Sequence, residues 1–195
     1  MRHWGKTYWR RRRDRLLKRH LVLEGKVLDI GCGWRNYGGK ALRLDLNPRC
    51  RPDIVADIQG ATGLPGASFD TILALDMLEH LRYPHRAVEE IRRLLKPGGL
   101  LYITVPFCFP RHGTEYYRFS DLGLQDMLAG FEAVIIPVQK GKFWNLLWNY
   151  YYQDTIVEGY FVKARKKIHP SKNSSCRNGR GNSCVLCSNP RDFSV

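Results

Sequence analysis

The sequence has few acidic residues relative to its basic ones and no long apolar stretch. Its 195 residues contain 18 Asp and Glu against 32 Lys and Arg, a formal net charge of +14. No run of about 18 or more apolar residues occurs, so we expect no membrane-spanning helix. The N-terminus is too basic and too poor in aliphatic residues for a signal peptide. We expect a cytoplasmic protein, with peripheral contact to a membrane as an open alternative.

Cysteines are too scattered in the body of the chain to suggest a disulfide framework. Three of them lie far apart, as reduced thiols do: Cys32, Cys50 and Cys108. Three more lie near the C-terminus: Cys176, Cys184 and Cys187. A structural zinc ion normally has four ligands in two close pairs, and His169 would supply the fourth at poor spacing. We therefore predict no metal site.

The positive charge is concentrated at the two ends of the chain. Residues 1–20 contain nine Lys and Arg and one acidic residue, and residues 163–195 contain eight and one. Residues 21–162 contain 15 Lys and Arg against 16 Asp and Glu and are nearly neutral. We expect a basic N-terminal helix or arm at 1–20, one domain at 21–164, and a disordered, basic, Cys-containing tail at 165–195.

The segment Lys26–Trp34 has the pattern of a buried strand that ends in a glycine-rich turn. Its apolar residues lead directly to Gly31 and Gly33. A strand ending in Gly-x-Gly can turn tightly into a helix and leave backbone amides accessible to a ligand. The third glycine of such a turn would stand at position 35, where this chain has Arg35. The pattern predicts a nucleotide-binding turn, and a purely structural strand-to-helix turn stays open.

Further apolar segments along the chain predict an α/β fold. We expect strands at Ala41–Leu46, Asp53–Ile58, Thr71–Leu75, Leu100–Val105, Phe131–Val138 and Thr155–Ala164. Apolar residues at spacings of three and four predict a helix over Pro84–Lys96, and Ser120 is expected to cap a second helix over Leu122–Leu128. Such alternation is typical of a mainly parallel sheet, which binds ligands at the carboxyl ends of its strands.

Acidic residues stand at those carboxyl ends. Asp45 suits a ribose, because a carboxylate can accept hydrogen bonds from both hydroxyls. Asp57 suits the amino group of an adenine. Asp76, Glu79 and His80 follow the fourth strand, and on a helical turn they could hold a divalent cation. Ordinary carboxylates at the start of a helix explain two of these three residues, so we assign no metal to them.

Three longer motifs are highly specific when taken together. They are LDIGCG at residues 28–33, FDTILALDMLEHL at 69–81 and LLKPGGLLYITVP at 94–106. In this order and spacing, over roughly residues 25–139, the chain resembles class I S-adenosylmethionine-dependent methyltransferases of the type 11 branch. The resemblance implies a Rossmann-like fold: a mostly parallel, seven-stranded sheet with an antiparallel last strand and helices on both faces. It implies S-adenosylmethionine as the cofactor.

The resemblance also implies roles for residues at the methionine end of the cofactor. Asp29 would order the turn, and Gly31 and Gly33 would lie against the methionine. Asp76 would meet the amino group of the cofactor. Arg35 departs from the family pattern and puts the geometry of the turn after Gly33 in question.

At the adenosine end, four residues are implied. Asp45 would bind the ribose hydroxyls, and Leu46 would cover one face of the adenine. Asp57 would accept a hydrogen bond from the adenine amino group, together with the backbone at Ile58.

The segment His112–Ser120 is expected to follow the fifth strand as a lid over the cofactor edge. A similar element occurs in type 11 relatives, which are often encoded among genes for cell-envelope polysaccharides. His80 and His112 are candidate general bases, because imidazole titrates near neutral pH. Tyr116 is a candidate for the wall of the acceptor pocket. A structural role stays open for this segment, with Arg118 paired to a carboxylate.

The segment Lys140–Gln153 is unusually rich in aromatic residues. They are Phe143, Trp144, Trp148, Tyr150, Tyr151 and Tyr152. Such a segment could be an interfacial membrane anchor, a cover for the acceptor, a dimer contact or a helix buried over the sheet.

The sequence predicts a methyltransferase that methylates a hydroxyl of a small-molecule or glycan-type acceptor, with an amine as a less favoured acceptor group. One alternative is an RNA methyltransferase that uses the basic arms as a phosphate clamp. Another is a non-catalytic cofactor-binding module at a membrane surface. For the small-molecule or glycan methyltransferase, a weak contact of the basic arms with an anionic membrane surface or with nucleic acid is a further expectation.

Overall fold

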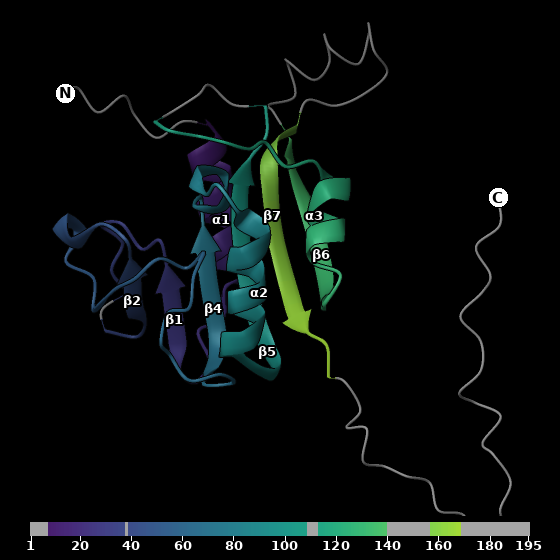
Figure 1. Cartoon of the computed structure of the whole chain (residues 1–195). Coiled ribbons are helices and arrows are strands. Elements are labelled where there is room, and N and C mark those ends of the chain that lie inside the picture. The colour runs from purple at the N-terminus through teal and green to yellow at the C-terminus, as the bar shows by residue number, and fades with distance from the viewer. Residues whose placement is uncertain (1–7, 38, 109–112, 140–156, 169–195) are drawn as a thin grey trace, which may run out of the picture.

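The fold is built on one seven-stranded sheet (Figure 1). The computed structural model describes residues 8–37, 39–108, 113–139 and 157–168. The strands are β1 (Val27–Ile30), β2 (Leu42–Asp45), β3 (Ile54–Val55), β4 (Phe69–Leu75), β5 (Leu95–Pro106), β6 (Phe131–Gln139) and β7 (Val157–Lys166). Their order is β3-β2-β1-β4-β5-β7-β6. Neighbours from β3 to β5 are parallel, and β7 is antiparallel to both β5 and β6. The predicted sheet is confirmed.

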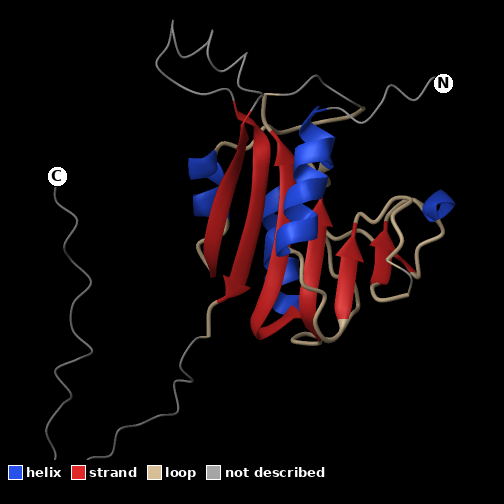
Figure 2. Ribbon diagram, turned by 180° about the vertical axis from the view of Figure 1, so that it is seen from behind, coloured by secondary structure: helices blue, strands red, loops and turns tan. Residues whose placement is uncertain are grey.

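Helices cover both faces of the sheet, as expected. The views in Figures 1 and 2 show α2 (Pro84–Leu94) and α3 (Asp121–Met127) on one face and α1 (Tyr8–His20) on the other. On the α1 face, Leu16 and Leu17 pack against a cluster that includes Tyr102 and Phe161. On the opposite face, the helices contribute apolar side chains to the main core: Ala87, Val88, Ile91, Leu94 and Leu124. None of the helices in the described segments is long and apolar enough to cross a membrane.

The ends of the two helices on the α2 face follow local rules. Pro84 stands in the first turn of α2, where a missing backbone N–H costs nothing. The predicted extension of α2 to Lys96 is wrong, because Leu95 already enters β5 and pairs with Phe69 of β4. Ser120 caps α3 as expected: its hydroxyl accepts a hydrogen bond from the backbone N–H of Gly123 (3.1 Å).

The connection from β1 to β2 differs from the prediction. Gly31 and Gly33 adopt left-handed backbone angles (φ 60° and 51°), as a tight turn requires. However, the described residues between β1 and β2 contain no helix, so the predicted turn into a helix is wrong. The Arg35 side chain holds this segment instead: it donates hydrogen bonds to the carbonyl oxygens of Gly31 (2.7 Å) and Leu75 (2.9 Å). These bonds tie the segment after the glycine turn to the ends of β1 and β4.

Several sequence predictions fall on residues outside the described segments. They are the candidate base His112, the aromatic segment Lys140–Gln153, and the three C-terminal cysteines. The other cysteines are free thiols, with Cys32 and Cys50 buried and Cys108 exposed. They are scattered as the sequence suggested.

Candidate active site

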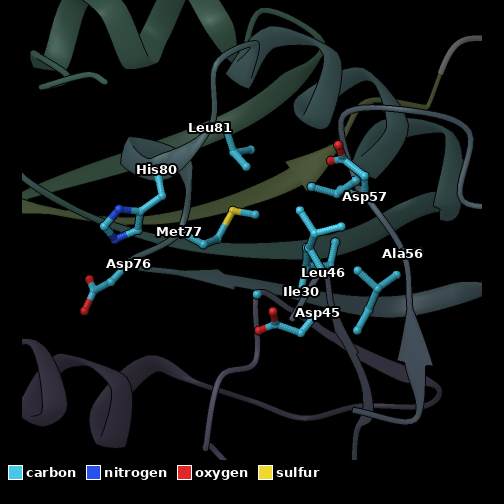
Figure 3. Close-up of a pocket in the computed structure, with 12 residues that line it drawn as sticks. Ile30, Asp45, Leu46, Ala56, Asp57, Asp76, Met77, His80 and Leu81 are labelled. Atoms are coloured by element: carbon cyan, nitrogen blue, oxygen red, sulfur yellow. The ribbon is translucent and has the colours of Figure 1, made fainter. Parts of the chain in front are cut away.

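A cavity of about 270 Å³ opens at the carboxyl edge of the sheet. Figure 3 shows its lining, with His80 and Asp76 near one end and Asp45, Leu46 and Asp57 toward the other. Seven residues singled out from the sequence line it: Gly31, Asp45, Leu46, Asp57, Ile58, Asp76 and His80. Five more lining residues were not singled out: Ile30, Leu44, Ala56, Met77 and Leu81. Most of the added residues are apolar side chains at strand ends, which sequence patterns assign to the core.

Three predicted site residues lie outside this lining. Asp29 is fully buried beneath the turn, and Gly33 donates its backbone N–H to a carboxylate oxygen of Asp45 (2.8 Å). Tyr116 is exposed, and its hydroxyl accepts a hydrogen bond from Arg82 (3.2 Å). Asp29 and Gly33 therefore do not line the cavity directly, and Gly33 contacts it only through its hydrogen bond to Asp45.

Gly31 is required at the cavity by both angle and space. A Cβ atom added there would lie 2.8 Å from the Cβ of Met77, far inside normal contact distance. Its positive φ would also strain any other residue. The close approach of Gly31 and Met77 joins the ends of β1 and β4 at the cavity floor.

Asp45 keeps acceptor capacity on both of its carboxylate oxygens. One oxygen accepts from the backbone N–H of Gly33 and the other from that of Asn47, both at 2.8 Å. A carboxylate oxygen has two lone pairs, so each retains one for a ligand hydroxyl. The neighbouring Leu46 is 62% exposed, which is unusual for a leucine and leaves an apolar surface at the cavity mouth.

Asp57 lies across the cavity from Asp45, and hydrogen bonds from Gln59, two residues later, hold its carboxylate in place. It accepts hydrogen bonds from the backbone N–H of Gln59 (2.9 Å) and from the side-chain amide of the same residue (3.1 Å). These contacts orient the carboxylate while leaving acceptor positions for an amino group.

Asp76 is held in a strained position at the end of β4. It is not a glycine, yet its φ is 51°. Its backbone N–H donates to the carbonyl of Thr104 (2.8 Å), and the Thr104 hydroxyl donates to one carboxylate oxygen (2.6 Å). The other oxygen forms an ion pair with Arg13 of α1. Such strain persists only where surrounding bonds fix it, and it is common at functional sites.

Arg13 was not predicted as a site residue. It lies within a run of four arginines, and the sequence offers no signal that separates it from the others. Only the docking of α1 on the sheet brings it to Asp76. The basic N-terminal segment therefore takes part in the site through one defined side chain.

Asp29 and Arg35 form an ion pair under the glycine turn, in which the carboxylate is buried and the Arg35 side chain is 31% exposed. Asp29 has no exposed surface, and its carboxylate lies 3.1 Å from the guanidinium of Arg35. Burial raises the pKa of the Asp29 carboxyl, and the positive charge of Arg35 opposes that rise. Arg35 thus compensates a charge that would otherwise be costly to bury.

Glu79 is a buried acid directly beside the cavity. Its side chain has no exposed surface, and neither carboxyl oxygen forms a hydrogen bond with a residue in the described segments. Burial, reinforced by the negative charges of Asp76 and Glu115, raises the pKa of Glu79 to about 8. The sequence predicted the position of Glu79 after β4 but not its burial, because burial depends on tertiary contacts with a loop far along the chain.

That loop is tied to Glu79 through its backbone. The carbonyl oxygen of Glu79 accepts hydrogen bonds from the N–H groups of Tyr116 (2.8 Å) and Tyr117 (3.4 Å). Within the loop, Arg118 forms an ion pair with Glu115. The predicted pairing of Arg118 with a carboxylate is confirmed, and Phe119 is buried in the core.

The hydrogen bonding of His80 fixes the position of its proton. Its Nδ1 lies 2.6 Å from the carbonyl oxygen of Thr114. A carbonyl can only accept, so Nδ1 carries the hydrogen and the Nε2 of the neutral ring carries the lone pair. Nε2 lies 3.8 Å from a carboxyl oxygen of Glu79. The ring therefore presents a basic nitrogen next to a buried acid.

The acidic residues at this edge do not assemble into an evident metal site. Within the described segments, no group of three or more His, Cys, Asp and Glu side chains is placed to hold a metal ion. Arg13 occupies one face of Asp76 instead.

Comparison with known proteins places this geometry in a family. A family model described as "Methyltransferase domain" matches residues 1–127. The "Ubiquinone biosynthesis O-methyltransferase" of Nitrosococcus oceani is 29% identical over 130 residues, covering 51% of this chain and 54% of the relative. The enzyme of the same name from Cereibacter sphaeroides is 31% identical over 109 residues, covering 45% and 44%. The chain thus spans about half the length of these curated relatives.

Solved structures share the fold. A "SAM dependent methyltransferase" from Archaeoglobus fulgidus has a TM-score of 0.62 at 16% identity, covering 78% of this chain and 92% of that one. The "[4+2]-Cyclase SpnF" has a TM-score of 0.59 at 20% identity, covering 85% and 84%. At these identities the likeness establishes architecture alone, whereas the family model covers more than half of the sequence. The chain therefore belongs to the methyltransferase domain family and has the class I fold of the S-adenosylmethionine-dependent enzymes.

Proposed function

We propose that the protein transfers a methyl group from S-adenosylmethionine to a hydroxyl of a small-molecule acceptor. The observation that carries this proposal is the convergence of Asp45, Asp57 and Asp76 on one cavity that His80 also lines. The names of the curated relatives, which are O-methyltransferases of ubiquinone biosynthesis, support oxygen as the acceptor atom. A glycan hydroxyl is included in the proposal as an acceptor class.

The residues present fit the adenosine half of the cofactor. The remaining lone pairs of Asp45 suit the two ribose hydroxyls, since each carboxylate oxygen has one acceptor position left. The exposed Leu46 would cover a face of the adenine. Asp57 and the backbone at Ile58 would bind its amino group.

The residues also fit the methionine half. An amino acid carries an ammonium and a carboxylate on neighbouring atoms, and the ion pair of Asp76 with Arg13 presents one partner for each. Asp76 would bind the ammonium group, and Arg13 would bind the carboxylate. The bound cofactor supplies a methyl group already activated by a positively charged sulfur.

The protein would add alignment and proton removal. Holding the acceptor in line with the methyl carbon can lower the barrier by roughly 7 kcal/mol or more. His80 Nε2 would take the hydroxyl proton, because hydrogen bonding to Thr114 leaves its lone pair on that nitrogen.

The test is release of S-adenosylhomocysteine in the presence of defined acceptors. We would compare catechols and hydroquinones with free hexoses, and measure the methylated product by mass spectrometry. Acceptor-dependent product with a new O-methyl group supports the proposal. Tight cofactor binding with no methylated product from any acceptor class would contradict it. A solved structure with this fold is named a cyclase, so the fold alone does not guarantee methyl transfer.

A further inference from the structure

A second, chemically different cavity lies away from the candidate active site. It has a volume of about 330 Å³ and is lined by Glu89, Arg92, Arg93, Gly130, Lys166 and Lys167, which we call the basic pocket. These residues come from the last turns of α2, the turn before β6 and the end of β7. Because β7 is antiparallel to β5, its end lies at the edge of the sheet opposite the carboxyl ends of β1 and β4 (Figure 1).

The lysines of the basic pocket are held in defined positions. The ammonium group of Lys166 donates to the carbonyl of Leu95 (2.6 Å), and that of Lys167 donates to the carbonyl of Ala129 (2.8 Å). An ammonium has three donors, so each lysine retains two. The pocket therefore presents ordered cations rather than freely moving ones.

The Arg92 side chain packs against Gly130, which has no side chain in its way. A Cβ atom added to Gly130 would lie 2.9 Å from the Cδ of Arg92, so the arginine stem lies directly on this glycine. In the described part of the chain, the Arg92 guanidinium has no hydrogen-bond or ion-pair partner. Arg93, by contrast, is already bound to Glu90 (2.7 Å).

The charges of the basic pocket are not balanced by its own acids. Four cations line it, and Glu89 is the one carboxylate among the lining residues. Burial and the nearby charge of Arg92 lower the pKa of Lys166, so bringing these cations together has an electrostatic cost. A bound anion would remove that cost.

We propose that the basic pocket binds a phosphate group, with Arg92, Lys166 and Lys167 as its ligands. A planar guanidinium can donate two parallel hydrogen bonds to phosphate oxygens, and ammonium groups bind phosphate as point charges. The site is separate from the methyl-transfer site and does not depend on the proposed function. Its ligand is a phosphate carried either by a soluble molecule or by a lipid headgroup.

A purely structural role would explain part of the arrangement. The carbonyls of Leu95 and Ala129 lie just beyond the C-termini of α2 and α3, where lysines commonly satisfy unpaired carbonyls. That role gives Arg92 no function, since it bonds to neither carbonyl. Arg92 therefore separates the two interpretations.

The experiment is a ³¹P NMR titration of the full chain with inorganic phosphate at constant ionic strength. We expect saturable binding by the wild type and at least tenfold weaker binding by Arg92→Gln. Gly130→Ala should also weaken binding, because it displaces Arg92 without removing its charge. The matched control is Arg86→Gln, an exposed arginine on the same helix that lies over Tyr83, and it should bind like the wild type. Circular dichroism checks that each variant is folded.

A second arm identifies the source of the phosphate. Flotation with phosphatidylglycerol vesicles that depends on Arg92, with no response to inorganic phosphate, supports the proposal with a lipid headgroup as the source. Saturable binding of inorganic phosphate that depends on Arg92 supports it with a soluble ligand. Equal behaviour of wild type and Arg92→Gln in both arms would overturn the proposal and leave only the structural role of the lysines.

Discussion

Two glutamates beside the sheet have opposite environments. At the carboxyl edge, Glu79 is fully buried without a hydrogen bond to any residue of the described segments, and its pKa is raised to about 8. On the α2 face, Glu90 is bonded to Arg93 and to Thr62, and these bonds lower its pKa to about 2. Arg93 also lines the basic pocket. Glu79 therefore keeps its proton to a higher pH than an ordinary glutamate, and Glu90 loses its proton at a lower pH.

A buried acid with a raised pKa beside a cavity indicates a functional site more strongly than an acid that is bound to an arginine. Hydrogen bonds from Arg93 and Thr62 stabilise the ionised form of Glu90, whereas burial disfavours the ionised form of Glu79.

The largest expected effect comes from His80. Replacing His80 by Gln should lower turnover about 10²–10⁴-fold, the usual contribution of a general base, while cofactor affinity stays unchanged. Steady-state kinetics with the identified acceptor and calorimetric titration of S-adenosylmethionine measure the two quantities. His85→Gln is the matched control, an exposed histidine on α2 outside the cavity lining. Unchanged turnover in His80→Gln would remove it from the mechanism.

The next effect is on stability, through Arg35. Arg35→Ala leaves the Asp29 carboxylate buried without its ion-pair partner, which should cost about 3 kcal/mol or more of unfolding free energy. Urea denaturation measures this loss. Arg35→Ala combined with Asp29→Asn should recover much of it, because no charge is then left buried. If the single variant is as stable as the wild type, the Arg35 side chain does not hold the turn.

A smaller effect distinguishes the two glutamates by pH. The raised pKa of Glu79 means that the native state keeps a proton that the unfolded state releases above about pH 4.5. Stability should therefore fall as pH rises toward 8, by about 1.4 kcal/mol per pH unit from this group. Glu79→Gln should flatten the decline measured by urea denaturation between pH 5.5 and 7.5.

Glu90 supplies the control for that pH experiment. Its lowered pKa adds stability that is present at neutral pH and lost only as pH falls toward about 2. Glu90→Gln should lower stability at pH 7 and leave the decline between pH 5.5 and 7.5 intact. A decline that is equally steep in Glu79→Gln would contradict the buried-acid account.

The smallest effect concerns Leu46. Leu46→Ala removes the exposed apolar surface at the cavity mouth and should weaken cofactor binding by roughly tenfold, the value of about 1.4 kcal/mol of lost contact. Val55→Ala, another exposed apolar residue on β3 outside the cavity lining, should bind like the wild type. Equal affinities for both variants would show that Leu46 does not cover the adenine.

Strand positions could be predicted from the sequence because apolar patterns are local, and the resemblance to class I methyltransferases supplied the antiparallel last strand. Asp45, Asp57 and Asp76 could be placed together in advance, since parallel strands end at the same edge. The contact of Arg13 with Asp76 could not be foreseen, because it depends on how α1 docks across a separation of 63 residues. The absence of a helix in the described residues after Gly33 could not be predicted either. Glycine spacing gives no information on the hydrogen bonds that Arg35 makes to this segment and to β4.

The burial of Glu79 lay equally beyond the sequence. Its carbonyl oxygen accepts hydrogen bonds from Tyr116 and Tyr117, which are 37 and 38 residues away in the sequence, while neither of its carboxyl oxygens forms a hydrogen bond within the described segments. Alternation and motif spacing predict that a carboxylate follows β4, but not how much of it remains exposed. The exposure of Glu79 is set by tertiary packing, and its burial in turn raises its pKa.

The most direct test of the central claim, that the carboxyl edge is a cofactor site, is calorimetric titration with S-adenosylmethionine. The wild type should bind with saturation, Asp45→Ala should bind on the order of 100-fold more weakly through loss of two hydrogen bonds to a charged group, and Asp126→Ala, an exposed carboxylate on α3, should match the wild type. Thermal melts of the same samples confirm that Asp45→Ala is folded. Equal affinity of Asp45→Ala and the wild type would contradict the account.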